Sequence, residues 1–335
     1  MAKSLTIGLI LFNEVEILPT LIKDLQQESL TLLTEIEWIF VINTGDIFTQ
    51  NKIVKIIQTL LKKYIVQLNT HNNIALARNL ILEHSHCDFI YYTDPDIKIQ
   101  PGSLKTMYET LLHSEDQFIS GVTGPHTLES KKNININKMF CLFRYLSSYL
   151  KQENQLFQST QHAKITHAPT CHLMIKKDYI KKINGFDPDF FDVAEDLDLS
   201  LRLNSETEFK YLFIPEARAQ HFFEKDLKIW LLKMFRYGYG QTLILKKHQF
   251  KRIMIHKLSV PALTIAAVLA VLKYPLISLL TLILVFIFAR FIVYTILSVY
   301  FYAAGQIFGL FLRTKRARNA KEIPPNKDLN SLFEV

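Results

Sequence analysis

Residues 88–99 read Asp-Phe-Ile-Tyr-Tyr-Thr-Asp-Pro-Asp-Ile-Lys-Ile, a short apolar run that ends in two carboxylates. The run Phe89–Tyr92 has the length and the aromatic content of a buried parallel strand. Asp94 and Asp96 follow it, and α/β sheets bind ligands at this end of their strands. Side chains at i and i+2 of an extended segment project to the same side, so both carboxylates can reach one divalent cation. A solvated Asp-Pro-Asp turn is the alternative for the motif taken alone.

Short apolar segments alternate with helical patterns on both sides of this stretch. Such alternation is typical of βαβ units, so we predict an α/β fold with a doubly wound, mostly parallel, Rossmann-like sheet. Residues 125–161 are irregular and polar, which indicates an insertion or a surface helix. The predicted strands are 4–12, 38–42, 65–68, 89–92, 172–175 and 211–214, and the predicted helices lie near 17–25, 53–61, 75–84, from 103 onward and at 195–203.

A long apolar block follows the α/β pattern. Between residues 258 and 312 only Lys273 and Arg290 are charged, and basic residues flank the block on both sides. Because cytoplasmic flanks are enriched in Lys and Arg, we expect both ends in the cytosol and an even number of crossings. At roughly 20 residues per span, two crossings fit, near 258–273 and 276–295.

This block divides the chain. Residues 1–250 are expected to form a globular domain, 251–257 a basic juxtamembrane linker, 258–312 the membrane region and 313–335 a basic cytoplasmic tail. The last part of the membrane region, 296–312, carries Gly305 and Gly309 four residues apart and is expected to be a packed or interfacial helix.

Composition limits the compartment and the partners. The net charge of +8 comes largely from the flanks of the apolar block, so anionic headgroups explain it and a nucleic-acid partner is not expected. The apolar run Leu5–Phe12 is too short for a signal peptide. Cys87, Cys141 and Cys171 give neither a disulfide framework nor a zinc spacing. We therefore expect a multi-pass protein of the cell membrane whose globular domain is cytoplasmic.

Six short motifs follow one another in the globular part of the chain. Together they resemble family 2 glycosyltransferases of the GT-A fold, and the resemblance covers roughly residues 4–245. The motifs are Phe12-Asn13-Glu14, Ala77-Arg78-Asn79, Asp94-Pro95-Asp96, Gly185-Phe186-Asp187, Glu195-Asp196, and Pro215-Glu216-Ala217 followed by His221.

The resemblance implies a metal-dependent, inverting sugar transfer from a nucleotide sugar. Charge that grows on the leaving diphosphate must be neutralised, and a divalent cation, Mn²⁺ or Mg²⁺, held by carboxylates does this. By resemblance, Asp96 and Asp94 bind the metal, with Asp94 toward the ribose, and His221 is the third ligand. A polar residue at a strand end is the alternative for His221. The other expected donor contacts are Phe12, Asn13, Glu14, Asn43 and Arg78.

The acceptor hydroxyl needs a positioned base because its pKa lies far above neutrality. The resemblance assigns this role to Asp196, with Glu195 orienting the acceptor. Helix N-terminal capping is the alternative for both residues and is the expected role of Asp198.

Two departures from the family pattern limit the inference. Many relatives carry Asp-Asp-Gly-Ser after the second strand, whereas this chain has Asn43-Thr44-Gly45-Asp46, which leaves the nucleobase open. The Gln-x-x-Arg-Trp motif of processive members is replaced by residues 233–237, Lys-Met-Phe-Arg-Tyr, which favours a single addition over polymerisation.

The expected function is sugar transfer from a cytosolic nucleotide sugar to a hydroxyl of a lipid-linked or membrane-proximal glycan, in cell-surface polysaccharide or glycolipid assembly. One alternative is a polyprenyl-phosphate sugar synthase, whose phosphate acceptor needs no base. Another is a non-catalytic, nucleotide-sugar-binding membrane scaffold, although such a protein would not need all of Asp94, Asp96, Glu195 and Asp196.

Overall fold

A computed structural model describes residues 3–32, 34–129, 162–165, 167–207, 209–222, 227–248, 297–298 and 300–309. The predicted spans near 258–273 and 276–295, the linker 251–257 and the tail 313–335 lie outside the described residues. So does most of the predicted insertion, with Cys141. Among the described residues, none of the helices combines the length and the apolar character that a bilayer crossing requires.

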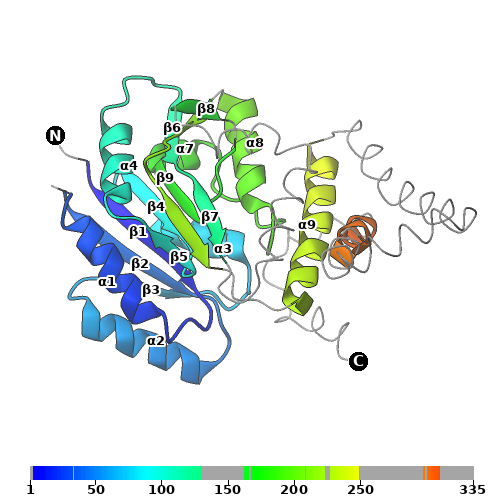
Figure 1. Ribbon diagram of the computed structural model, residues 1–335, viewed down its shortest axis with the longest axis horizontal. Coiled ribbons are helices and arrows are strands. Elements are labelled where there is room, and N and C mark those ends of the chain that lie inside the picture. Colours follow the sequence, from blue (N-terminus) through cyan, green and yellow to red (C-terminus); the bar gives the residue numbers. More distant parts are fainter. Residues whose placement is uncertain are drawn as a thin grey trace, which may run out of the picture. The chain divides into compact units, whose positions relative to one another are not determined.

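The first part of the chain builds a parallel sheet in the order β3-β2-β1-β4 (Figure 1). The predicted strands and helices of this part are confirmed, with boundaries that shift by a few residues. In chain order the elements are β1 (Leu5–Leu11), α1 (Leu18–Ser29), β2 (Ile36–Ile42), α2 (Ile47–Leu60), β3 (Ile65–Leu68), α3 (Ile74–His84) and β4 (Phe89–Thr93).

The second part extends the sheet beyond β4 with β9, β6, β10 and β8, to eight strands. β9 runs antiparallel to both β4 and β6, β10 is parallel to β6, and β8 is an antiparallel edge. The predicted mostly parallel sheet is confirmed, but its second part is mixed. The added elements are α4 (Ser103–Leu112), β6 (Ile119–Thr123), β8 (Ala163–Ile165), β9 (His172–Lys176), α7 (Lys177–Lys182), α8 (Glu195–Thr207) and β10 (Lys210–Phe213).

Three short strands form a second sheet that the sequence patterns did not predict. Its order is β5-β11-β7, with β5 (Ile97–Ile99) directly after the Asp-Pro-Asp turn, β7 at His126–Glu129 and β11 at Ala219–Phe222. β11 pairs antiparallel with β5 and parallel with β7. Residue 221, expected in the segment that follows a strand, therefore lies within one.

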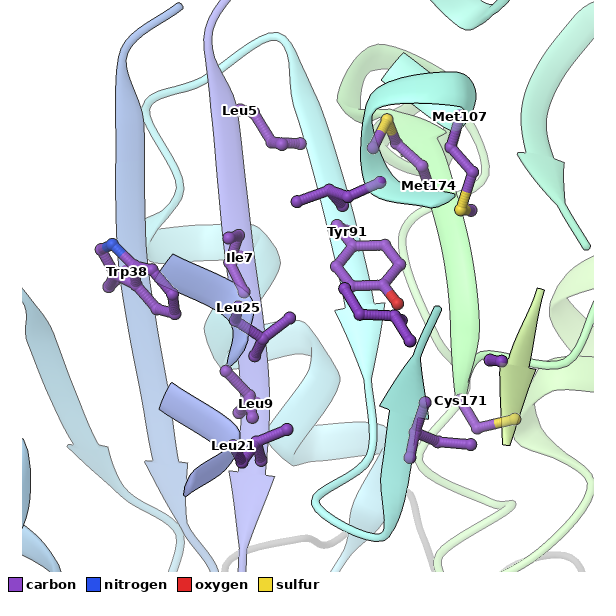
Figure 2. Packing of buried hydrophobic residues seen from close by; sticks show 14 of the residues in the cluster. Leu5, Ile7, Leu9, Leu21, Leu25, Trp38, Tyr91, Met107, Cys171 and Met174 are labelled. Atoms are coloured by element: carbon purple, nitrogen blue, oxygen red, sulfur yellow. The ribbon is translucent and has the colours of Figure 1, made fainter. Parts of the chain in front are cut away.

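The eight-stranded sheet has a buried apolar cluster on each face. One cluster joins β1 to α1, α2 and α4, and the other joins the opposite strand faces to α3, α7 and α8. Figure 2 shows Leu5, Ile7 and Leu9 of β1 on the same side as Leu21 and Leu25 of α1, as the two-residue period of a strand requires. Burying each such side chain contributes about 1.5–3 kcal/mol. This core makes the sheet edge a rigid base for the loops that follow the strands.

A second compact unit contains α9 (Leu227–Lys247) and the helical residues 297–298 and 300–309. The two helices cross closely, since a Cβ on Gly305 would lie 1.9 Å from the Phe235 carbonyl oxygen and one on Gly238 would lie 2.0 Å from that of Tyr302. Residues 297–298 and 300–309, which carry Gly305 and Gly309, are helical, and the assignment of this segment to a membrane region stays a prediction. α9, which we had placed in the globular domain 1–250, groups with this unit and not with the sheet.

Candidate active site

The turn between β4 and β5 presents the two carboxylates of the Asp-Pro-Asp motif. The amide N–H of Ile97 donates to the Asp94 carbonyl at 3.1 Å, which closes the turn around Pro95. The side chains of Asp94 and Asp96 are 33% and 32% exposed, so both are accessible to a ligand from solvent. The predicted position of the motif, at the carboxyl end of a buried strand, is confirmed.

His221 is brought to this turn by the pairing of β11 with β5. His221 lies opposite Ile97 in the antiparallel register, and the Phe222 N–H donates to the Asp96 carbonyl at 2.8 Å. As a result the His221 Nε2 atom lies 3.0 Å from the Asp96 Oδ2 atom. The structure therefore places the predicted metal ligands Asp96 and His221 side by side.

Asp94, the other carboxylate of the motif, lies near a guanidinium. Its Oδ1 atom is 3.7 Å from Nη2 of Arg78, which comes from α3. The described part of the chain contains no group of three or more His, Cys, Asp or Glu residues arranged to hold a metal ion. The roles of Asp94, Asp96 and His221 as metal ligands therefore stay predictions.

Arg78 also binds the first acidic residue of α8. Its Nη1 atom contacts the Glu195 carboxylate, and only 6% of the Arg78 side chain is exposed. The ring of Phe186 lies 5.8 Å from the guanidinium carbon. Three motifs that are far apart in the sequence therefore meet at one buried guanidinium.

The beginning of α8 sets the positions of Glu195 and Asp196. Ala194 has a left-handed backbone (φ +65°), and the Asp196 carboxylate accepts the Leu197 N–H at 2.7 Å. Burial and the adjacent Asp196 charge raise the pKa of Glu195 to about 7, although Arg78 opposes the shift. Burial would also raise the pKa of Asp196, but His167 and Arg78 outweigh it and the net shift is downward. Asp196 is therefore a carboxylate at neutral pH.

The loop before α8 is fixed by a network around the Gly-Phe-Asp turn. Gly185 has φ +74°, and Asn79 exchanges two hydrogen bonds with the backbone of Phe186, both at 2.8 Å. Arg202 donates to the carbonyls of Ile183 and Gly185. Asp198, which we expected to act as a helix cap, is fully buried and accepts from Arg202 Nε at 2.8 Å, so its contact is structural.

The ends of β1 and β2 carry the other predicted donor contacts. Glu14 accepts the N–H groups of Phe12 and Asn13 at 2.6 and 2.9 Å, which folds the Phe12-Asn13-Glu14 segment back on itself. Burial, with a contribution from the Asp96 charge, raises the pKa of Glu14 despite these bonds. Asn43, only 1% exposed, has no hydrogen-bond partner for either side-chain polar atom within the described ranges. Buried polar groups normally have a hydrogen-bond partner, so the Asn43 side chain is an exception.

Two histidines that we did not predict belong to the same region. The Nε2 atom of His167 lies 3.8 Å from Oδ2 of Asp196. His172, fully buried at the start of β9, donates Nε2–H to the Ala217 carbonyl at 2.9 Å and lies 2.8 Å from the Tyr91 hydroxyl. Burial lowers the pKa of His172 to about 4, so the ring is neutral and Tyr91 donates to Nδ1. It fixes the turn that leads into β11.

Strand direction explains why these histidines were missed. Because β9 is antiparallel to β4, His172 pairs with Thr93 and the start of β9 lies at the edge where β4 ends. The signal was the sequence His-Ala-Pro-Thr-Cys-His at 167–172, which holds two histidines immediately before a predicted strand. It would have indicated the site only if the antiparallel direction had been known.

Comparisons with known proteins give a family and a fold for the chain. A family model described as glycosyl transferase family group 2 matches residues 89–304, a range that contains both acidic motifs and His221. Among solved structures, the chain is similar to the mannosyltransferase PcManGT from Pyrobaculum calidifontis, in complex with GDP-Man and Mn²⁺. The identity is 15%, the match covers 93% of this chain and 88% of that chain, and the TM-score is 0.62. This likeness supports the predicted GT-A-like fold. Among curated proteins, nothing matches the chain.

Proposed function

Because the chain belongs to glycosyl transferase family group 2, it is a nucleotide-sugar glycosyltransferase, and we propose that it transfers one sugar, with inversion, to an acceptor hydroxyl. The observation that carries the proposal is the meeting of the two acidic motifs with Arg78 and His221. Asp96 faces His221, Asp94 faces Arg78, and Arg78 binds Glu195, the residue before Asp196.

A divalent ion would be held by Asp96 and His221. Their atoms lie 3.0 Å apart, and a carboxylate oxygen with an imidazole nitrogen suits Mn²⁺ better than Mg²⁺, which prefers oxygen ligands only. When bound, such an ion neutralises the charge that develops on a leaving diphosphate. Asp94 would contact the ribose side of the donor, next to Arg78.

Asp196 would act as the general base. The acceptor oxygen forms a bond to the anomeric carbon, the bond from that carbon to the diphosphate oxygen breaks, and the hydroxyl proton passes to Asp196. With a pKa below its ordinary value, Asp196 accepts the proton late, when the bonding acceptor oxygen has become strongly acidic. Glu195, fixed by Arg78, would orient the acceptor.

The loops after β1 and β2 would bind the rest of the donor. Asn43 is buried and lacks a partner among the described residues, so it can offer both a donor and an acceptor to a nucleobase. Glu14 would set the conformation of Phe12 and Asn13, because it accepts their backbone N–H groups. We do not expect its carboxylate to contact the diphosphate.

We further propose that the enzyme works at a membrane, with its site in the cytoplasm and its acceptor linked to a lipid or close to the bilayer. The apolar sequence between residues 258 and 312 and its basic flanks support this proposal. The test of the whole proposal is incubation of the full-length chain with a panel of nucleotide sugars and Mn²⁺, read as released nucleotide. Release of nucleotide from one donor supports the function. If the chain neither binds any of the donors nor releases nucleotide from them, the function is contradicted.

A further inference from the structure

Arg78 joins the two halves of the site by contacts that the activity alone does not require. One guanidinium nitrogen approaches Asp94, in the motif that faces the donor and the metal. Another contacts Glu195, next to the residue that faces the acceptor. We propose that Arg78 is a positioning residue that couples donor binding to the acceptor half by sharing its charge between Asp94 and Glu195. This inference rests on the proposed function.

The sharing follows from the charges and the burial. Arg78 carries one positive charge that cannot be lost, while Asp94 and Glu195 offer it two carboxylates. The guanidinium is almost completely buried, so solvent screens it little. A stronger interaction on one side therefore comes at the expense of the other. The longer contact, to Asp94 at 3.7 Å, has room to shorten when Glu195 weakens.

Arginine can make this link, but lysine cannot. The planar guanidinium presents separate nitrogens to two carboxylates, whereas an ammonium is a single point charge. Asn79 and Arg202 hold the Gly-Phe-Asp turn that precedes α8, while the Phe186 ring lies beside the guanidinium. These contacts hold Arg78 and Glu195 in fixed positions. A change in the interaction of Arg78 with Asp94 therefore alters its interaction with Glu195.

The direction of the coupling can be derived. A donor that hydrogen-bonds to Asp94 competes with Arg78 for that carboxylate and leaves Glu195 with a larger share of the guanidinium. Donor binding thus strengthens the contact that positions Glu195, and the donor is expected to bind before the acceptor. Because coupling between two sites is reciprocal, weakening Glu195 must make the donor bind less tightly.

The test is a double-mutant cycle on donor affinity, which needs no acceptor. The dissociation constant of a nucleoside diphosphate with Mn²⁺, chosen as the tightest of UDP, GDP, ADP, CDP and TDP, is measured by calorimetry on the full-length chain. We expect Glu195→Gln to weaken binding about three- to thirtyfold. In an Asp94→Asn background the same change should have less than a twofold effect.

A matched control removes an acidic charge elsewhere. Glu109→Gln lies on α4, at a side chain that is 54% exposed and paired with Lys105, and should leave the dissociation constant unchanged. Arg78→Lys keeps the charge but breaks the double contact, so Glu195→Gln should lose its effect in this background too. If the Asp94 variant fails to fold, this second cycle, of Arg78→Lys with Glu195→Gln, tests the coupling in its place.

The outcomes separate this inference from the function. If the wild-type chain binds a diphosphate and the effects of Glu195→Gln and Asp94→Asn simply add, the coupling is refuted and the glycosyltransferase proposal stands. If Glu195→Gln leaves binding within twofold of wild type, the coupling is refuted as well. If the wild-type chain binds none of the five diphosphates, the proposed function fails first.

Discussion

The His221 Nε2 atom lies 3.0 Å from the Asp96 carboxylate, although 125 residues separate the two in the chain. We expect His221→Ala to lower Mn²⁺ affinity by about tenfold or more, because a lost ligand has at least the effect of a lost outer-shell partner. Asp96→Ala should weaken Mn²⁺-dependent nucleotide binding, and chelation should abolish turnover. Titration of the unliganded chain with Mn²⁺ checks the first result. Full transfer in excess chelator would show that both residues are structural.

Replacing Asp196 by Asn separates a base from a helix cap. Asn caps a helix about as well as Asp, so the fold should survive. It cannot take a proton, so turnover should fall by about 10²- to 10⁴-fold while donor affinity stays near normal. Steady-state kinetics and calorimetry check this. Glu109→Gln serves as the control, since Asp198 is buried against Arg202 and its replacement would disturb the fold. An Asp196→Asn variant that remains active would favour the phosphate-acceptor alternative.

Because the buried Asn43 amide has no hydrogen-bond partner among the described residues, we expect its replacement to have opposite effects on stability and binding. Asn43→Leu removes a buried polar group that has no partner among the described residues, so the free enzyme should become more stable, by about 1–3 kcal/mol. The same change should weaken nucleoside diphosphate binding by roughly tenfold, the effect of about 1.4 kcal/mol. Denaturant unfolding and calorimetry measure the two. Destabilisation with unchanged binding would mean that Asn43 is a structural residue.

The raised pKa of Glu195 predicts an acid limb in the pH profile. Below about pH 7 the Glu195 carboxyl is protonated, so it no longer attracts Arg78 as an anion and is less firmly positioned. We therefore expect kcat/KM to rise as the pH increases through about 7. Asp196 cannot cause this limb, because its pKa lies below its ordinary value. In Glu195→Gln the residual activity should lose the limb. Stability depends on pH in the opposite direction. The contribution of Glu195 to the free energy of unfolding is fully present below its unfolded pKa, near 4.5, and is lost as the pH rises through about 7.

The sequence predicted the strands that are long or strongly apolar and the helices with a clear stripe. β1 and β4 are fully buried over their length, and their patterns were unambiguous. β5, of three residues, and β11, of four, are too short to show a period, and β11 carries the partly exposed His221. Their pairing depends on a long-range register that no local pattern encodes.

The candidate site was predicted as separate motifs and not as contacts. Arg78 was identified from its neighbours Ala77 and Asn79, but nothing near it indicates that its partner is Glu195. His167 was missed because its proximity to Asp196 follows from the antiparallel direction of β9. Sequence patterns determine which elements form, whereas the meeting of side chains depends on how those elements pack.

The contact between Arg78 and Glu195 also has a consequence for the newly made chain. The two residues are 117 positions apart, so Arg78 leaves the ribosome long before its partner. At translation rates of about 5–20 residues per second, the interval is roughly 6 to 23 seconds. During that time Asp94 is the only one of the two carboxylates that has been synthesised. The contact that buries the guanidinium against Glu195 can therefore form only after α8 has been made.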